Sequence, residues 1–187
     1  MAEHGFEIDW SELPTPEDDG AAAHLTGMRL PALILKATDG QHVTLSALPG
    51  VTVLYIYPMT GTPGVALPEG WNEIPGARGC TPQSCAYRDR FAELRAAGAD
   101  HVFGLSTQSP ADQRAAAERL HLPFALLSDE DLALASALTL PMFDTSAGRH
   151  HKRMTLILRD GAIVQVFYPV FPPDADAARV MDRLAAS

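Results

Sequence analysis

The sequence predicts an α/β domain with a central mixed sheet and helices on both faces. Residues 51–57 form an apolar, β-branched and aromatic run, which is typical of a central strand buried on both faces. Strand-like and helix-like segments then alternate through residues 82–138. Residues 154–167 carry the pattern of an antiparallel hairpin, which would close the sheet.

The composition is that of an ordinary globular chain. With 187 residues, 47% hydrophobic and 20% charged, it can form one domain with a sizeable core. Seven of the 23 acidic residues lie within residues 1–20, which hold no Lys or Arg. The other 16 acids face 14 bases, so most of the net charge of −9 lies in the N-terminal segment. This distribution does not indicate a surface for nucleic acid or for an anionic membrane.

The cellular compartment decides how the two cysteines are interpreted. The chain has no apolar run long enough to span a bilayer, and its first residues lack the basic and then apolar order of a secretion signal. We therefore expect a cytoplasmic protein. There, Cys80 and Cys85 are expected to be catalytic, redox-active or metal-binding rather than a structural disulfide.

Two parts are expected along the chain. Residues 1–27 are acidic and turn-rich, and we interpret them as an extension that is mobile or draped over the surface, with a solvated tail as the favoured interpretation. Residues 28–187 are expected to form the α/β domain. The apolar residues that could pin the extension to the domain are Phe6, Ile8, Trp10 and Leu13.

The first predicted element of the domain is a hairpin. Asp39-Gly40 separates two strand-like runs at residues 32–37 and 41–45, which is a good turn signal. The buried run at 51–57 comes next. Residues 59–79 then contain five Gly and three Pro, which predicts a long loop.

A helix is predicted after this loop, over residues 82–97. Thr81 suits the N-cap, Pro82 suits the first helical position, and Gly98 would end the helix. The apolar face of this helix consists of Tyr87, Phe91 and Leu94.

The remaining predicted elements alternate along the chain. In order, they are a strand at 101–105, a helix from Ser109 to Leu120, a strand at 123–127, a helix from Ser128 to Leu138, hairpin strands at 154–158 and 162–167, and an amphipathic helix at 174–186.

Cys80 is the strongest candidate for chemistry. A thiol attacks only as its thiolate, and the N-terminus of a helix offers unpaired N–H groups and a positive dipole that stabilise an anion. Cys80 comes just before the predicted helix, with Arg78 and Arg88 close in sequence. We therefore interpret Cys80 as a nucleophile.

Cys85 lies in the first turns of the same helix. Two α-carbons five residues apart in a regular helix are roughly 8–9 Å apart, beyond the reach of a relaxed disulfide. A bond from Cys85 to Cys80 therefore requires the first turn to unwind. Two alternatives stay open. The cysteines could be small core residues, or two ligands of a zinc site completed by His150 and His151, although adjacent histidines in a loop are usually solvated.

Several segments together resemble a known family. Gly79-Cys80-Thr81…Cys85, followed by Tyr87-Arg88-Asp89, resembles the active-site helix of atypical two-cysteine peroxiredoxins, in the subgroup called bacterioferritin comigratory protein or peroxiredoxin Q. The resemblance covers residues 28–187. The other segments that agree in order are Tyr55-Ile56-Tyr57-Pro58, Thr62-Pro63-Gly64, and residues 104–107, 126–131 and 153–158.

The resemblance implies a thioredoxin-like fold and the reduction of hydrogen peroxide and organic hydroperoxides, with no metal or organic cofactor. Cys80 would be the peroxidatic thiolate that becomes a sulfenic acid, and Cys85 would resolve it as an internal disulfide. Thioredoxin or a similar dithiol would reduce that disulfide. Arg153 would stabilise the thiolate and the charge on the departing oxygen. Relatives of this subgroup are often monomeric, so we expect a monomer without nucleic-acid or membrane partners.

The sequence departs from the family pattern before the cysteine. The family has proline, three residues, then threonine, proline, glycine and cysteine. Here Val65 stands where the cysteine is expected, and Cys80 comes fifteen positions later. We interpret residues 65–78 as an inserted loop, and Pro82 as delaying the helix so that Cys80 is more exposed than in the family. Thr62 is the threonine expected near Cys80, and its substitutes are Thr60 and Thr81.

Two further functions stay open beside the peroxidase. One is a thiol–disulfide oxidoreductase acting on protein disulfides, although four residues separate the cysteines here and two separate them in the thioredoxin motif. The other is a non-catalytic, redox-sensing thioredoxin-fold protein in which the insertion has disabled the pocket.

Overall fold

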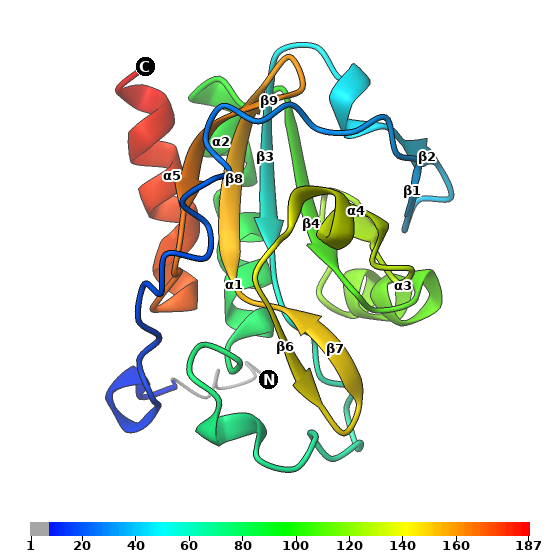
Figure 1. Cartoon of the computed structure of the whole chain (residues 1–187), viewed down its shortest axis with the longest axis vertical. Coiled ribbons are helices and arrows are strands. Elements are labelled where there is room, and N and C mark those ends of the chain that lie inside the picture. Colours follow the sequence, from blue (N-terminus) through cyan, green and yellow to red (C-terminus); the bar gives the residue numbers. More distant parts are fainter. Residues whose placement is uncertain (1–7) are drawn as a thin grey trace.

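The computed structural model describes residues 8–187, which fold around a mixed β-sheet (Figure 1). In the described part of the chain this sheet has seven strands in the order β2-β1-β5-β4-β3-β8-β9. Their bounds are β1 (Leu35–Ala37), β2 (His42–Val43), β3 (Val51–Ile56), β4 (His101–Ser106), β5 (Leu126–Ser128), β8 (Met154–Arg159) and β9 (Ala162–Phe167). A separate hairpin consists of β6 (Met142–Thr145) and β7 (Gly148–His151).

Strand pairing confirms the predicted mixed sheet. β3 lies at the centre, parallel to β4 and antiparallel to β8, and β4 is parallel to β5. Both predicted hairpins are present, because β1 pairs antiparallel with β2 and β8 pairs antiparallel with β9. The sequence missed the β6–β7 hairpin.

All six residues of β3 are buried, and successive side chains enter different cores, as the strand period requires. Tyr55 packs in a core with α1 (Cys80–Asp89), α2 (Phe91–Ala96) and α5 (Asp176–Ala185). Leu54 and Ile56 pack on the opposite face with α4 (Ala133–Leu138). The sheet therefore has helices on both faces, as predicted, with α3 (Pro110–Arg119) packed near β5 (Figure 1).

The predicted helix at 82–97 differs from the structure in two respects. It begins earlier, at Cys80, and its N-cap is Gly79 rather than Thr81. It also divides into α1 and α2, because Arg90 leaves helical geometry with φ −102° and ψ 9°. Pro82 is tolerated because the first-turn N–H groups of a helix have no partner in the helix.

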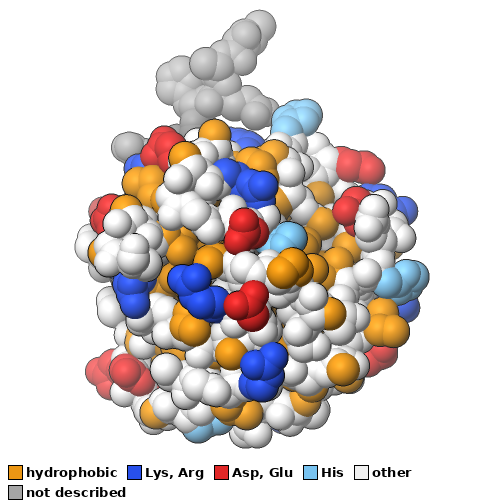
Figure 2. Space-filling view, turned by 90° about the horizontal axis from the view of Figure 1, so that it is seen from above, with side chains coloured by type: hydrophobic (Ala, Val, Ile, Leu, Met, Phe, Trp, Pro, Cys, Tyr) orange, Lys and Arg blue, Asp and Glu red, His pale blue; other side chains and the backbone are white. Residues whose placement is uncertain are grey.

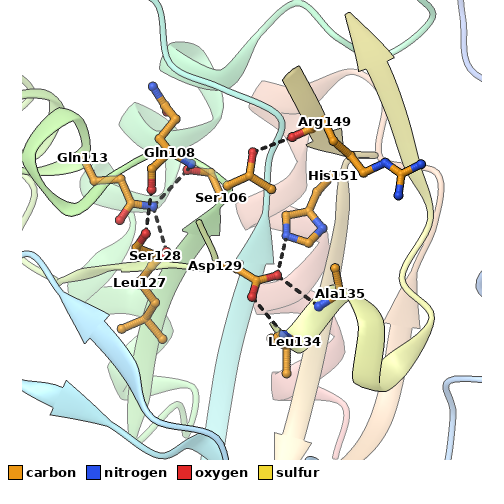
Figure 3. Close-up of polar contacts among 11 residues, drawn as sticks. Ser106, Gln108, Gln113, Leu127, Ser128, Asp129, Leu134, Ala135, Arg149 and His151 are labelled. Carbon is orange, nitrogen blue, oxygen red and sulfur yellow. Dashed lines mark hydrogen bonds and ion pairs between the residues drawn. The ribbon is translucent and has the colours of Figure 1, made fainter. Parts of the chain in front are cut away.

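The prediction that Ser128 caps a helix is wrong. Ser128 ends β5, and its hydroxyl donates a 2.6 Å hydrogen bond to the Gln108 carbonyl. The carboxylate of Asp129 instead accepts from two N–H groups at the start of α4, those of Leu134 and Ala135, at 2.8 and 3.0 Å. Figure 3 shows that Asp129 also points toward the ring of His151.

The described part of the N-terminal segment packs against the domain. Leu25 is fully buried in the core. Asp19 accepts hydrogen bonds from Lys152 and Tyr168, both at 2.8 Å. Trp10 donates to Asp174 at 3.1 Å. Residues 8–27 are therefore held along the surface at these points, and the favoured expectation of a solvated tail is wrong for this part of the segment. Of the predicted anchors, Phe6 lies outside the described residues.

Figure 2 shows one end of the molecule, where acidic and basic side chains alternate with apolar ones. Within residues 8–187, the structure has no helix of the length and apolar character that a membrane crossing requires.

Candidate active site

Cys80 is the first residue of α1 and is only 4% exposed. Its Sγ atom accepts a hydrogen bond from Arg153 Nη2 at 3.2 Å and lies 3.4 Å from the backbone N–H of Met59. The Ala77 carbonyl oxygen is 3.7 Å away. The expected late start of the helix is therefore wrong, and Cys80 is buried. Because the helix begins at Cys80 and not after Pro82, the sulfur faces inward beneath the loop.

Gly79 makes this placement of Cys80 possible. Its φ of +112° lies in the region that side chains disfavour. A Cβ atom there would also lie 2.6 Å from Pro173 Cγ and 2.8 Å from Trp10 Cη2. Glycine is therefore required both by the backbone turn into α1 and by the close packing of two neighbouring segments.

Arg153 precedes β8 and is 3% exposed. Its guanidinium donates to the carbonyl oxygens of Gly76, Ala77 and Arg78 at 3.2–3.3 Å, and to Gln83 Oε1. Within the described residues, Arg153 forms no ion pair with a carboxylate. A buried guanidinium that contacts only neutral oxygens and the Cys80 sulfur can stabilise negative charge that develops at this sulfur.

A second polar layer lies behind Arg153. Asp176 Oδ2 accepts hydrogen bonds from Gln83 Nε2 at 2.8 Å, Tyr87 OH at 2.8 Å and Thr155 Oγ1 at 2.7 Å. Burial raises the pKa of Asp176, and the hydrogen bonds from Thr155, Gln83 and Tyr87 oppose this. Sequence reasoning missed this layer. A usable signal was that Gln83 lies four residues before Tyr87 and so shares its buried helix face.

Cys85 lies further along α1 and is half-buried, and both cysteines are free thiols. Burial raises the pKa of Cys85. The charge of Arg88 lowers this pKa and the charge of Asp89 raises it, both by smaller amounts than burial does. Because both cysteines lie within one regular helix, a disulfide between them requires α1 to unwind locally.

A cavity of about 430 Å³ opens beside Cys80. Thr62 is exposed and lines it, but is not a hydrogen-bond partner of Cys80 Sγ among the described residues. Thr81 lines the cavity as well. Thr60 does not, because it is buried and hydrogen-bonded to Gln108. The apolar residues that line the cavity are Ile8, Met59, Pro63, Val65, Leu67, Trp71, Ala77 and Pro82.

The segment at residues 65–78 is anchored by Trp71. This side chain is 3% exposed and lines the cavity beside Cys80. Its ring also packs against Phe143 and His150 of the β6–β7 hairpin, with centroid distances of 5.8 and 5.2 Å. Trp71 therefore both anchors the loop and forms a wall of the site.

The two adjacent histidines are buried in β7, contrary to the expectation of a solvated loop. His150 lies 2.9 Å from Thr145 Oγ1, and burial lowers its pKa. His151 lies 3.2 Å from Asp129 Oδ2 (Figure 3). Among the described residues, the structure contains no group of three or more His, Cys, Asp or Glu that could hold a metal ion.

Comparison with known proteins identifies relatives of this chain. The Redoxin family matches residues 25–182. The chain is 34% identical over 145 residues to "Peroxiredoxin Q, chloroplastic" of Populus jackii, covering 76% of this chain and 59% of that protein. It is 32% identical over 166 residues to the protein of the same name from Gentiana triflora, covering 84% and 67%. The chain thus spans 59% of the length of the Populus relative.

A solved structure agrees with these relatives. The fold is similar to that of peroxidoxin BcpB from Mycobacterium tuberculosis, with a TM-score of 0.68 and 26% sequence identity. The match covers 86% of this chain and 96% of that one, so the likeness extends over nearly the whole of the solved protein.

Proposed function

The chain belongs to the Redoxin family, with peroxiredoxins of the Q and bcp type as its relatives, and we propose that it is a thiol-dependent peroxidase. Its fold is thioredoxin-like, with the mixed sheet and flanking helices of these relatives. One observation supports the activity above all others. Cys80, at the N-terminus of α1, lies 3.2 Å from the buried guanidinium of Arg153.

The proposed first step is attack by the Cys80 thiolate on the terminal oxygen of a hydroperoxide. An S–O bond forms, the O–O bond breaks, and the departing alkoxide or hydroxide takes a proton from solvent. Cys80 becomes a sulfenic acid and the peroxide is reduced to an alcohol or water. Arg153 stabilises the thiolate and then the negative charge on the departing oxygen.

The proposed second step joins the two cysteines. Cys85, as its thiolate, attacks the sulfur of the sulfenic acid, so that an S–S bond forms, the S–O bond breaks, and the departing hydroxide takes a proton from solvent to become water. Thioredoxin or a similar dithiol then reduces the disulfide and is itself oxidised. No metal or organic cofactor takes part.

The cavity beside Cys80 is the proposed substrate site. Its apolar lining suits the alkyl group of an organic hydroperoxide, and hydrogen peroxide is small enough to enter. Thr62 is proposed to donate its hydroxyl to the bound peroxide, because it lines this cavity within the segment that leads from β3. A monomeric, cytoplasmic enzyme remains our expectation.

A coupled assay tests the proposal. NADPH, thioredoxin reductase and thioredoxin are mixed with the protein, and NADPH oxidation is followed after addition of hydrogen peroxide or tert-butyl hydroperoxide. We expect peroxide-dependent turnover that vanishes in Cys80→Ser. A protein that instead reduces insulin disulfides without consuming peroxide would be the thiol–disulfide oxidoreductase. A protein with neither activity would be the redox sensor.

A further inference from the structure

We propose that Asp176 is a positioning residue for Arg153 and acts through the side-chain amide of Gln83. The proposal rests on the proposed peroxidase function, in which Arg153 activates Cys80. Asp176 contacts neither Cys80 nor Arg153 directly by hydrogen bond in the described structure. It begins α5, is 1% exposed, and lies 93 positions beyond Gln83 in the sequence.

Asp176 joins the two elements that carry the reacting groups. Two of its three donors, Gln83 and Tyr87, belong to α1, which begins at Cys80. The third, Thr155, lies on β8, two residues after Arg153. One carboxylate oxygen therefore contacts both the helix that begins at the cysteine and the strand that follows the arginine, which places it within reach of Gln83.

The chemistry of the Gln83 amide explains how Asp176 acts on Arg153. The Gln83 side chain has one acceptor oxygen and one donor nitrogen, and both are engaged here. Asp176 Oδ2 accepts from Gln83 Nε2 at 2.8 Å, so the opposite end, Oε1, faces Arg153 Nη1 and accepts from it. Since Arg153 has only donors, the reverse orientation would bring the amide NH₂ against the guanidinium. The acceptor at position 176 thus selects the orientation that holds Arg153.

This orientation matters because Nη1 of Arg153 donates to Gln83, whereas its Nε and Nη2 atoms donate to other groups. Its remaining acceptors are the carbonyls of the loop at residues 76–78 and the sulfur of Cys80 itself. Oε1 of Gln83 is a buried side-chain oxygen that accepts a hydrogen bond from Arg153. Loss of this contact would let the guanidinium turn away from Cys80, so both thiolate stabilisation and charge stabilisation would weaken.

The main experiment compares Asp176→Leu, which lacks an acceptor, with Asp176→Asn, which keeps an oxygen. Two rates are measured. One is the second-order rate constant for oxidation of Cys80 by hydrogen peroxide. The other is alkylation of Cys80 by iodoacetamide in the Cys85→Ser background. We expect Asp176→Leu to slow both rates about tenfold, the scale of one hydrogen bond to a charged group. Asp176→Asn should stay within about twofold of the unaltered protein, because its amide oxygen still accepts.

A matched control separates positioning from stability. Tyr87→Phe removes another hydrogen bond to the same carboxylate but leaves Gln83 untouched. We expect it to lower the free energy of unfolding, measured in urea, without changing either rate. A merely structural role for Asp176 predicts instead that the rates follow stability, so that Tyr87→Phe slows the reaction as well.

A double variant tests the route through Gln83. In the Gln83→Ala background, Asp176→Leu should cause no further loss of rate, although it should still lower the free energy of unfolding. If Asp176→Leu does not fold, Asp176→Ala provides the smaller acceptor-free side chain.

The proposal is overturned if the acceptor-free variants react as fast as the unaltered protein, or if they slow the reaction equally when Gln83 is absent. Should the unaltered protein consume no peroxide, the proposed function fails. The alkylation rates would still decide the role of Asp176, because they need only the Cys80 thiolate.

Discussion

Arg153 Nη2 lies 3.2 Å from Cys80 Sγ, although the two residues are 73 positions apart in the sequence. The strand that follows Arg153, β8, is the antiparallel neighbour of β3, and the loop after β3 leads to Cys80. The central sheet therefore brings a buried cation to the N-terminus of α1.

Replacing Arg153 should remove most of the activity while the fold persists. In Arg153→Met, Cys80 loses its nearest positive charge, so we expect the rate constant with hydrogen peroxide to fall by about a hundredfold or more, the usual effect of losing one such donor. Rapid mixing with peroxide measures this rate. Arg149→Ala is the matched control, because Arg149 is exposed and pairs with Asp144 at 2.9 Å. Similar rates for both variants would contradict the role of Arg153.

Oxidation should unwind the first turns of α1. A relaxed disulfide between Cys80 and Cys85 cannot form inside a regular helix, and unwinding would also break the bonds from Gln83 and Tyr87 to Asp176. We expect backbone amides at residues 83–87 to exchange with deuterium faster in the disulfide form than in the reduced form. The helix α3 serves as the internal reference and should exchange equally in both. Equal protection of α1 in the two forms would rule out the unwinding.

Gly79 should tolerate no side chain. We expect Gly79→Ala to lower the free energy of unfolding for two reasons. The positive φ costs about 1–2 kcal/mol, and the clash with Trp10 and Pro173 costs about 1–3 kcal/mol more. Gly98→Ala is the matched control, because Gly98 has a φ of +109° but a Cβ atom there would meet no atom within 4 Å. Urea unfolding of both variants measures the difference. If the two lose equal stability, the packing against Gly79 contributes nothing.

The pH dependence of Cys85 should differ from that of a free cysteine. Burial raises the pKa of Cys85, so the thiol stays protonated to higher pH and reacts slowly near neutrality. In Cys80→Ser, we expect the rate of alkylation by iodoacetamide to rise with pH through a midpoint above the free-cysteine value of roughly 8.5. The unfolded variant in urea provides the reference midpoint. A folded midpoint at or below that reference would contradict the effect of burial.

The local sequence was enough to predict elements that carry a clear pattern of their own, such as an apolar run, a turn pair or a helix cap. The buried run that became β3, the Asp39-Gly40 turn, and the Ser109 cap of α3 are all confirmed. The β6–β7 hairpin was missed because its strands are partly polar, and its buried His150 packs against Trp71. That packing is tertiary and leaves no local pattern.

The candidate active site likewise contains residues that the sequence could predict and residues that it could not. Cys80 could be singled out from its position before a helix, and its partnership with Arg153 followed from a family resemblance rather than from spacing. The Gln83–Asp176 contact joins positions 93 residues apart, so no periodicity could predict it. Thr62 stays a prediction, since it lines the cavity of Cys80 without bonding to the sulfur among the described residues.

Rapid mixing of Cys80→Ser and Cys85→Ser with hydrogen peroxide tests the central claim most directly. Mass spectrometry of the products identifies the oxidised residue. We predict that Cys85→Ser consumes one equivalent of peroxide and holds a sulfenic acid at Cys80, whereas Cys80→Ser does not react on this time scale and forms no internal disulfide. Fast oxidation of Cys80→Ser, with a slow reaction only in Cys85→Ser, would contradict the account and assign the peroxide chemistry to Cys85.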